Sequence, residues 1–479
     1  MGILKIFRKE QPENLNTSGY EEFLKVYPEF SETAFLDDLR NKEYKRLDKK
    51  QHVYLDYTGG NLYSESLLRE HLEYLKENLF GNPHSTNPSS LLATKKAEDA
   101  RSYVLKYFNA EDDYMCIFTL NSSGALKIVG ECYPFNSTSH FLLSYDNHNS
   151  VNGIREFAKN QGASFSYIPI NYEDLRINEQ ALYSSLDSYS EKSNKLFAFP
   201  AQSNVSGVKH PLKYIDEARS KGWDVLLDAA AFVPSSRLDL KKVQPDFVCV
   251  SFYKIFGYPT GIGALLVRKE MFSKLKKPWF AGGTVKLASV LVDKHYLTHN
   301  HERFEDGTIN YLGLPAVENG LRFIESVGIE NINKRVSVLT DFTLKKMQEL
   351  KHSNGRNLIQ VFGPQDNYSR GGTIIFNYFD VNGKKYPFDY IQELSNSENI
   401  SLRTGCFCNP GIDEVNTCLN TEELKNYFDS REIIDYNEMY DFLGKLRGAV
   451  RISMGIVSNY SDIEYFLSFS RKFLDKELN

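Results

Sequence analysis

Short apolar runs alternate with longer amphipathic stretches between about residues 50 and 330. Six of the apolar runs have the length of strands: 115–120, 140–144, 195–199, 225–228, 247–251 and 263–267. The amphipathic stretches 90–108 and 122–131 have the length and spacing of helices. Strands that alternate with helices need crossover connections, so this pattern predicts an α/β domain built on a largely parallel sheet.

The pattern changes in the last third of the chain. Segments 312–327 and 329–350 are predicted to be long helices. Beyond them we expect strands at 359–362, 373–376 and 450–453, and helices at 386–395 and 461–478. The chain is therefore predicted to have three parts: a helical N-terminal segment (1–49) that packs on the main body, a large domain (50–330) and a small α+β C-terminal domain (331–479).

Composition and charge exclude several classes of protein. The 479 residues are 41% hydrophobic and 25% charged, which is ordinary for a globular protein. The net charge of −5 gives no basic surface for nucleic acid or an anionic membrane. No apolar run has the length of a membrane span, and the first residues lack the apolar core of a signal peptide. We therefore expect a cytoplasmic protein that binds neither nucleic acid nor membrane.

The six cysteines are too few and too scattered for a disulfide framework. Free thiols in a reducing compartment are expected instead. Cys116 and Cys249 lie inside apolar runs and are predicted to be buried as small hydrophobic residues. Cys406, Cys408 and Cys418 stay as candidates for chemistry.

Two predicted strands end in residues that suit a pyridoxal-phosphate (PLP) site. Asp228 ends the strand 225–228, and Lys254 follows the strand 247–251 just before a turn rich in Gly and Pro. A PLP enzyme needs a lysine whose amine bonds the cofactor aldehyde and a carboxylate that keeps the pyridine nitrogen protonated. A strand-end Asp is often only a helix cap, and a lysine before a loop is often only solvated. Both together at the carboxyl ends of successive strands favour a cofactor site.

The segment 119–125 places a polar turn between a predicted strand and a predicted helix. Its residues Ser122, Ser123 and Gly124 stand where the helix begins, and backbone amides at such a position bind phosphate. The same residues also suit an ordinary capped helix. The phosphate interpretation therefore depends on Asp228 and Lys254.

The segment 402–411 combines a cation, a glycine turn and two thiols in one loop. Arg403 would favour the thiolate of a nearby cysteine, which is the nucleophilic form. The spacing of Cys406, Cys408 and Cys418 matches no standard zinc pattern, so no metal is predicted. A metal site and a purely structural loop remain as alternatives to a reactive thiol.

Together these segments resemble the class V group of fold-type I PLP enzymes, and in particular the N-terminal, cysteine-desulfurase-like domain of molybdenum cofactor sulfurases. The resemblance runs from about residue 50 to the C-terminus and is carried by segments 54–56, 81–85, 227–233, 251–261, 403–411 and 450–453. It implies an α/β fold of the fold-type I PLP-dependent transferase class, with PLP as the cofactor and L-cysteine as the substrate.

By position, the resemblance implies Lys254 as the lysine that bonds the cofactor and Asp228 as the partner of its pyridinium nitrogen. His148 would stack on the cofactor ring and help to move protons. The phosphate would be held by Ser122, Ser123 and Ser251, and by Thr308 from a second subunit, because the family forms homodimers.

The resemblance also implies the residues that handle the substrate. These are Asn204, Arg451, Arg403 and His84, with Arg451 forming a bidentate pair with the carboxylate. Cys408, five residues after Arg403, matches the desulfurase nucleophile, and Cys406 is its neighbour. The implied function is a desulfurase that forms a persulfide on Cys408, releases alanine and passes sulfur to an acceptor protein or a molybdenum cofactor carrier.

Two departures from simple desulfurases are similar to the sulfurase branch: Tyr253 replaces a His, and Ala231 replaces a Gln. Residues 57–60 depart from the sulfurase pattern itself. Because no residues follow 479 to form a molybdenum-cofactor-binding domain, we expect a separate protein or another acceptor. The alternatives are a class V aminotransferase, a C–S or C–Se lyase acting on a cysteine derivative, and a non-catalytic partner protein with the same fold.

Overall fold

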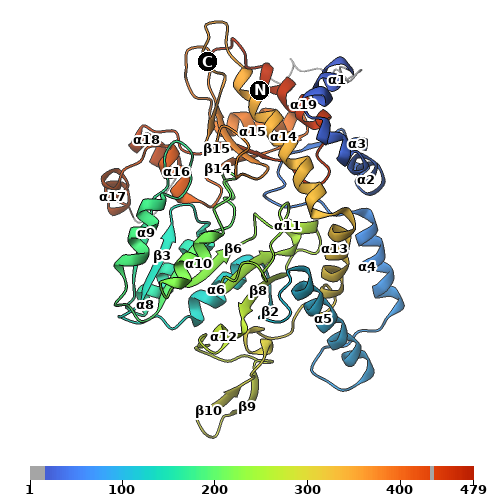
Figure 1. Ribbon diagram of the computed structural model, residues 1–479, viewed down its shortest axis with the longest axis vertical. Coiled ribbons are helices and arrows are strands. Elements are labelled where there is room, and N and C mark those ends of the chain that lie inside the picture. The colour runs from blue at the N-terminus through green and yellow to red at the C-terminus, as the bar shows by residue number, and fades with distance from the viewer. Residues whose placement is uncertain (1–16, 432–435, 479) are drawn as a thin grey trace.

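A seven-stranded sheet forms the centre of the computed structural model, which describes residues 17–431 and 436–478 (Figure 1). Its strand order is β2-β8-β7-β6-β5-β3-β4. The strands are β2 Tyr114–Thr119, β3 His140–Ser144, β4 Ser164–Ile168, β5 Lys195–Pro200, β6 Asp224–Asp228, β7 Phe247–Ser251 and β8 Gly263–Arg268. β4, β3, β5, β6 and β7 pair in parallel, whereas β8 is antiparallel to both β7 and β2. The predicted, largely parallel sheet is thus confirmed, with one reversed strand.

The reversal of β8 follows from the short connection before it. Only α11 (Phe252–Phe256) and a turn separate β7 from β8. A parallel neighbour needs a crossover of about a dozen residues or more, so the chain returns antiparallel.

Both faces of this sheet are buried, because alternate side chains of each strand point to opposite sides. In β7, Val248 and Val250 belong to one core cluster, and Phe247 and Cys249 belong to the other. The second face is covered by α6 (Ser122–Cys132) and α8 (Ile154–Asn160). The first face is covered by α5 (Pro88–Tyr107), α9 (Glu179–Ser188), α10 (Lys213–Ser220) and α13 (Leu314–Val327). Strands buried on both sides explain the continuous apolar runs in the sequence.

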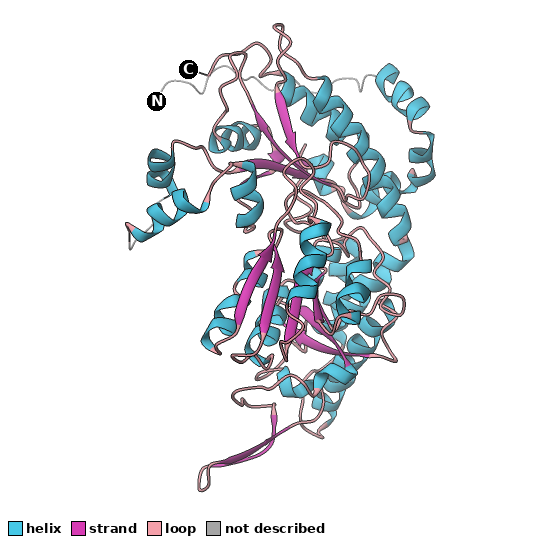
Figure 2. Ribbon diagram, turned by 60° about the vertical axis from the view of Figure 1, so that its left-hand side comes forward, coloured by secondary structure: helices cyan, strands magenta, loops and turns pink. Residues whose placement is uncertain are grey.

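A second sheet of four antiparallel strands lies above the first in Figure 2. Its order is β11-β12-β15-β14, from β11 Ile359–Phe362, β12 Thr373–Tyr378, β15 Ala449–Ser453 and β14 Arg403–Gly405. The helices α14 (Ile329–Glu349), α15 (Phe388–Ser397) and α19 (Tyr460–Arg471) pack around it. The last helix is shorter than the predicted 461–478, since the chain turns after Arg471 and Asp475 has a left-handed φ of 55°.

Two insertions were not predicted from the sequence. Between β14 and β15 the chain forms α16 (Pro410–Asn416), α17 (Thr421–Asp429) and α18 (Tyr436–Leu443), and α17 and α18 project from the body (Figure 1). Strands β9 (Val285–Ser289) and β10 (Lys294–Leu297) form a hairpin that projects from the large domain (Figure 2). Neither insertion contributes much to the core, so neither has the strong apolar pattern that marks the central strands.

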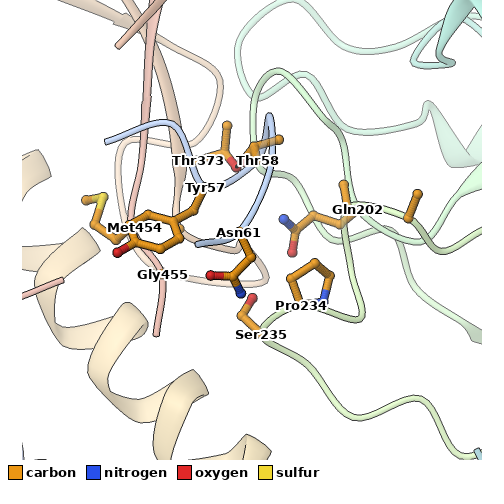
Figure 3. A pocket seen from close by; sticks show the side chains of 12 residues that line it. Tyr57, Thr58, Asn61, Gln202, Pro234, Ser235, Thr373, Met454 and Gly455 are labelled. Carbon is orange, nitrogen blue, oxygen red and sulfur yellow. Dashed lines mark hydrogen bonds between the residues drawn. The ribbon is translucent and has the colours of Figure 1, made fainter. Parts of the chain in front are cut away.

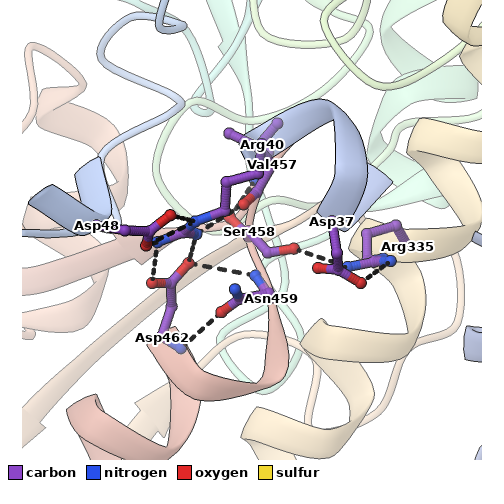
Figure 4. Close-up of polar contacts among 9 residues, drawn as sticks. Asp37, Arg40, Asp48, Arg335, Val457, Ser458, Asn459 and Asp462 are labelled. Carbon is purple, nitrogen blue, oxygen red and sulfur yellow. Dashed lines mark hydrogen bonds and ion pairs between the residues drawn. The ribbon is translucent and has the colours of Figure 1, made fainter. Parts of the chain in front are cut away.

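The N-terminal segment packs on α14 and α19. It comprises α1 (Thr17–Val26), the 3₁₀ helix η1 (Pro28–Thr33), α2 (Phe35–Glu43) and α3 (Arg46–Lys49). Figure 4 shows the buried arginines that join these elements. Arg335 of α14 lies 4.0 Å over the ring of Phe30 and pairs with Asp37 at 3.0 Å. Arg40 of α2 pairs with Asp462 of α19 at 2.5 Å.

The remaining elements include a short strand pair that links the two domains. β1 (Val53–Tyr54) pairs in parallel with β13 (Ile400–Ser401), and Asp56 then forms a bridge with Ser453. This pairing joins the start of the large domain to the small one. The helices α4 (Glu65–Glu77), α7 (Asn149–Asn152) and α12 (Lys269–Phe272) and the 3₁₀ helix η2 (His301–Phe304) lie in the large domain. Among the residues with assigned structure, no helix is long and apolar enough to cross a membrane.

Candidate active site

Asp228 and Lys254 lie at the carboxyl ends of two adjacent parallel strands. Asp228 is the last residue of β6 and pairs with Cys249 of β7. Lys254 lies in α11, which starts directly after β7. α11 ends at Gly257, where φ is 83° and an added Cβ would lie 2.4 Å from the carbonyl carbon of Leu62. Only glycine allows both this conformation and this close approach.

The electrostatic surroundings of Lys254 favour its neutral, nucleophilic form. Burial lowers the pKa of Lys254, and the nearby cations Arg451 and Arg403 lower it further. Asp228 and Asp56 act in the opposite direction. Lys254 makes no hydrogen bond to another residue of the described chain through its amine. The amine is therefore partly shielded from solvent, close to a carboxylate and not held by a structural partner.

His148 stands at the beginning of α7 and faces the same two residues. The backbone N–H of Ser150 donates to His148 Nδ1 at 3.1 Å, so in the neutral ring the proton is on Nε2. Burial lowers the pKa of His148; Asp228 opposes this shift and Lys254 adds to it. The structure thus brings His148, Asp228 and Lys254 within electrostatic reach of one another.

The start of α6 offers polar groups suited to an anion. The Ser122 N–H donates to Ser251 Oγ at 2.8 Å, which ties the helix to the end of β7. Ser122 Oγ is buried and has no hydrogen-bond partner within the described residues. Ser123 Oγ lies 2.6 Å from Ser150 Oγ, next to His148. A buried hydroxyl without a partner at a helix N-terminus fits a phosphate group.

Asp56 holds Arg403 and Arg451, the two arginines that were predicted to handle the substrate. Arg403 Nε donates to Asp56 Oδ2 at 3.0 Å, and Arg451 donates to Asp56 Oδ1 at 2.8 Å. The Arg451 side chain is almost fully buried, and its Nε has no partner in the part of the chain with described structure. No role for Asp56 was predicted from the sequence, although the segment 54–56 was part of the resemblance.

The loop that carries Cys408 has an unusual backbone. Asn409 N–H donates to the Cys406 carbonyl at 3.1 Å, which closes a four-residue turn. Both central residues are left-handed, with φ 56° at Phe407 and 55° at Cys408, as in a type I′ turn. Such angles are rare for residues other than glycine. The predicted substrate residue Asn204 holds this turn by donating to the Phe407 carbonyl at 2.8 Å.

The cysteines divide into a buried and an accessible group. Cys116, Cys132 and Cys249 are buried, and burial raises the pKa of each thiol, to about 12 for Cys116 and Cys132. The prediction that Cys116 and Cys249 are buried is confirmed. Cys408 and Cys418 are exposed and Cys406 is half-buried. No cluster of three or more potential metal ligands occurs among the residues described.

His84 and Thr308 lie elsewhere in the chain's own fold. His84 Nδ1 is 3.7 Å from Glu302, and an added Cβ on Gly283 would approach its Nε2. The exposed Thr308 accepts a long, 3.5 Å hydrogen bond from Asn82. The structure therefore places these two predicted residues near each other, on surface loops, and joins them by no described contact to Lys254 or Arg451.

A pocket opens between the two domains beside the strand end of β6 (Figure 3). Its lining includes Asn61, Gln202, Ala231, Thr373 and Met454. None of the predicted site residues lines it, but Ala230 and Ala231 follow Asp228 directly. Gln202 is 3% exposed and its Oε1 has no partner among the described groups.

Comparisons with known proteins agree with this geometry. The chain is 37% identical to the molybdenum cofactor sulfurase of Oryza sativa subsp. japonica, over 91% of this chain and 57% of that protein. It is 36% identical to the molybdenum cofactor sulfurase of Homo sapiens, over 91% of this chain and 51% of that protein. The chain thus spans little more than half the length of the curated relatives it matches.

Among solved structures, an apo cysteine desulfurase from Thermococcus onnurineus NA1 has a TM-score of 0.75 at 24% identity, covering 91% of this chain and 97% of that one. The cysteine desulfurase CsdA from Escherichia coli has a TM-score of 0.69 at 19% identity, covering 91% and 98%. These similarities confirm the predicted fold class.

The family model described as aminotransferase class-V matches residues 53–466, which include every candidate site residue. The sulfurase relatives agree with the resemblance that the sequence motifs carried. This chain belongs to the aminotransferase class-V family.

Proposed function

We propose that this protein is a PLP-dependent L-cysteine desulfurase in which Cys408 receives the sulfur. One observation carries the proposal. The backbone N–H of Asn149, next to His148, donates to the Cys408 carbonyl at 2.7 Å. The segment 402–411, called the thiol loop below, therefore lies directly against the residues that surround Lys254, as a transfer of sulfur from a bound substrate requires.

The residues present fit PLP. Lys254 offers an amine with a lowered pKa, Asp228 a carboxylate, and Ser122, Ser123 and Ser251 the polar cradle of an anion. When bound, PLP supplies an aldehyde that bonds an amine and a pyridinium ring that withdraws electrons. His148, kept neutral by burial, can hold or return a proton through its ring.

The substrate carboxylate would bind beside Asn204, Arg403 and Arg451. The Nε of Arg451 is buried without a partner among the described residues, so it is an open donor for an anion. The Arg403 side chain is half-exposed. Because Asp56 already pairs with both cations, it would set their positions and leave them one further anion to bind.

The proposed reaction transfers one sulfur atom from a carbon of L-cysteine to the thiol sulfur of Cys408. The C–S bond of L-cysteine breaks, and an S–S bond forms between its sulfur and Cys408 Sγ. The substrate carbon gains a proton, so that L-cysteine and the Cys408 thiol become alanine and a persulfide. Lys254 would act as the base and acid at the substrate α-carbon, since its pKa is lowered by burial.

The sulfur acceptor would be the molybdenum cofactor or the protein that carries it. This part of the proposal rests on the sulfurase relatives, which have further sequence beyond the region that this chain matches. All six cysteines are thiols in the described structure, and we propose a cytoplasmic location, where thiols stay reduced.

We also propose a homodimer in which Thr308 completes the phosphate site of the partner. Thr308 is exposed and far along the chain from the cradle of α6. The hairpin nearby has apolar side chains that stand in solvent, with Val290 and Leu291 more than nine-tenths exposed. An apolar tip of this kind usually marks an interface.

The function can be tested with purified protein, PLP and L-cysteine. Alanine and protein-bound persulfide should form in equal amounts in a single turnover without reductant. L-alanine, which lacks the sulfur, is the control and should give no persulfide. A keto acid with amino-group transfer, or pyruvate with no protein-bound sulfur, would instead show an aminotransferase or a lyase.

A further inference from the structure

The segment 145–149, which runs from the end of β3 to the first residue of α7, contacts the thiol loop at three points. Its Asn149 N–H binds the Cys408 carbonyl, and its Asp146 accepts a hydrogen bond from Asn409. The third contact is between the backbones of Gly411 and Tyr145. They lie so close that a Cβ added to Gly411 would be 2.2 Å from the Tyr145 carbonyl oxygen. The two loops come from different domains, so these contacts dock one domain on the other beside the candidate active site.

Asp146 is the centre of a fully buried polar network. Its side chain is 0% exposed, as is that of His210. Oδ1 accepts from Ser203 Oγ at 2.8 Å and from Asn409 Nδ2 at 2.7 Å, while Oδ2 pairs with His210 Nε2 at 2.9 Å. Since a carboxylate only accepts, the His210 proton at this contact is on Nε2. Ser203 and His210 thus fix the carboxylate from the large domain, and its open side faces Asn409.

Asn409 joins this network to the turn that carries Cys408. Its Nδ2 donates to Asp146 and also to Asn204 Oδ1 at 3.1 Å. Its Oδ1 accepts from the N–H of Ile412 and caps α16. One side chain therefore ends the turn, begins the following helix and fastens both to a buried carboxylate.

We propose that Asp146 and Asn409 form a latch that positions Cys408 for sulfur transfer. Non-glycine residues in left-handed conformations persist only where the surroundings hold them, and Phe407 and Cys408 are two such residues in succession. Asp146 is two positions from His148, so one loop sets both the cofactor side and the thiol side of the site. Asp146, Asn409 and His210 act as positioning residues, and this role rests on the proposed desulfurase function.

A merely structural role for Asp146 predicts different behaviour. In that case loss of the Asn409 contact would lower thermal stability but leave the thiol loop in place once the protein is folded. The latch predicts the reverse: the fold survives, because Ser203 and His210 still bind Asp146, and the loop is released.

The test uses three variants of the PLP-loaded, full-length protein. Asn409→Asp keeps the acceptor that caps α16 but sets a carboxylate against Asp146. Asn409→Ser keeps a capping oxygen without the charge. The double variant Asp146→Asn, Asn409→Asp exchanges the amide and the carboxylate and restores a donor–acceptor pair.

Two measurements report the state of the loop. The first is the rate of chymotrypsin cleavage after Phe407, which does not depend on desulfurase chemistry. Asn409→Asp should be cleaved at least tenfold faster than the wild type, Asn409→Ser at an intermediate rate, and the exchanged pair close to the wild-type rate. The second is persulfide formation from L-cysteine, where kcat should fall at least tenfold in Asn409→Asp with KM and cofactor absorbance unchanged.

Equal cleavage of wild type and Asn409→Asp would overturn the latch, as would an exchanged pair that is cleaved as fast as Asn409→Asp. If Asn409→Asp does not fold, the comparison of Asn409→Ser with the wild type decides the question by the same cleavage rate. A wild-type protein that forms no persulfide would refute the desulfurase function instead, and the cleavage rates would still decide whether the latch exists.

Discussion

Asp228, His148 and Lys254 lie at the ends of regular strands and helices, whereas Cys408 lies on a loop held by hydrogen bonds from distant parts of the chain. The first group is fixed by β6, β7 and their buried surroundings. The thiol turn is fixed by single contacts such as Asn204 to Phe407 and Asn149 to Cys408. The residues proposed to bind the cofactor are therefore held rigidly by regular secondary structure. The turn that carries Cys408 could instead be released by removing one or two polar contacts.

This difference suits a carrier of sulfur. The groups that act on the substrate must stay in place to within a fraction of an ångström. The residue that carries sulfur away must first approach the substrate and then reach an acceptor. A loop with an exposed thiol and a few breakable contacts can do both.

The largest effect is expected at the rigid side, for Lys254→Ala. Alanine formation from L-cysteine should fall by about 10³-fold or more, because the variant loses the base at the α-carbon as well as the amine that bonds the cofactor. Melting temperature should change little, since the Lys254 amine has no hydrogen-bond partner among the described residues. Retained turnover near the wild-type rate would contradict the assignment of Lys254.

Asp228→Asn should have the next largest effect. Without the carboxylate the pyridine nitrogen of bound PLP is no longer kept protonated and the ring withdraws electrons less well, so kcat should fall by about 10²-fold or more. The amide can still accept from the Ala230 N–H that now binds Asp228 Oδ1 at 3.0 Å, so the local backbone should survive. The check is kcat together with the absorbance of bound PLP; a kcat within twofold of the wild type would remove Asp228 from the mechanism.

On the flexible side, Gly411→Ala should separate the two loops. The added Cβ would lie 2.2 Å from the Tyr145 carbonyl oxygen, so backbone must move at a cost of about 1–3 kcal/mol. Persulfide formation should fall about tenfold while PLP binding is kept. Gly282→Ala is the control, because nothing lies within 4 Å of a Cβ there. Equal rates for the two variants would show that the docking of the thiol loop does not matter.

The smallest effect concerns pH. Burial lowers the pKa of Lys254, and Arg403 lowers it further. In Arg403→Met one cation near Lys254 is lost. Asp56 also loses one of its two ion-pair partners, so its negative charge acts more strongly on Lys254. Both changes raise the pKa of Lys254. Because the neutral amine reacts with the aldehyde, the midpoint of PLP incorporation into the apo-protein should move to higher pH. The midpoint is read from cofactor absorbance, and an unchanged or lower midpoint would contradict this electrostatic picture.

The same contrast explains what could be predicted from the sequence. The strands β3 and β7 match their predicted bounds, because buried strands leave an unambiguous apolar run. β11 also matches its predicted bounds, although only Ile359 in it is buried. Asp228 and Lys254 could be selected because Asp228 ends one such run and Lys254 lies shortly after the end of another. The direction of β8 could have been derived from its short connection to β7.

The contacts of the thiol loop could not be predicted in this way. Asn409 and Asp146 are 263 positions apart, and no local pattern marks either residue as a partner of the other. No local pattern predicted the role of Asp56 either. Its role comes from its ion pairs with Arg403 and Arg451, and these two arginines are brought together by the pairing of β14 with β15. The hairpin β9–β10 was not predicted, because its side chains are largely exposed and belong to no core cluster, so its sequence lacks the apolar pattern of a buried strand.

The most direct test of the account is to locate the sulfur after a single turnover with L-cysteine. Fragment mass spectrometry of the segment 403–411 can assign one added sulfur atom to Cys406 or to Cys408. The added sulfur is expected on Cys408 in the wild type and in Cys406→Ala, and none is expected in Cys408→Ala, although that variant still binds PLP. Persulfide that forms on Cys406 in Cys408→Ala at the wild-type rate would contradict it.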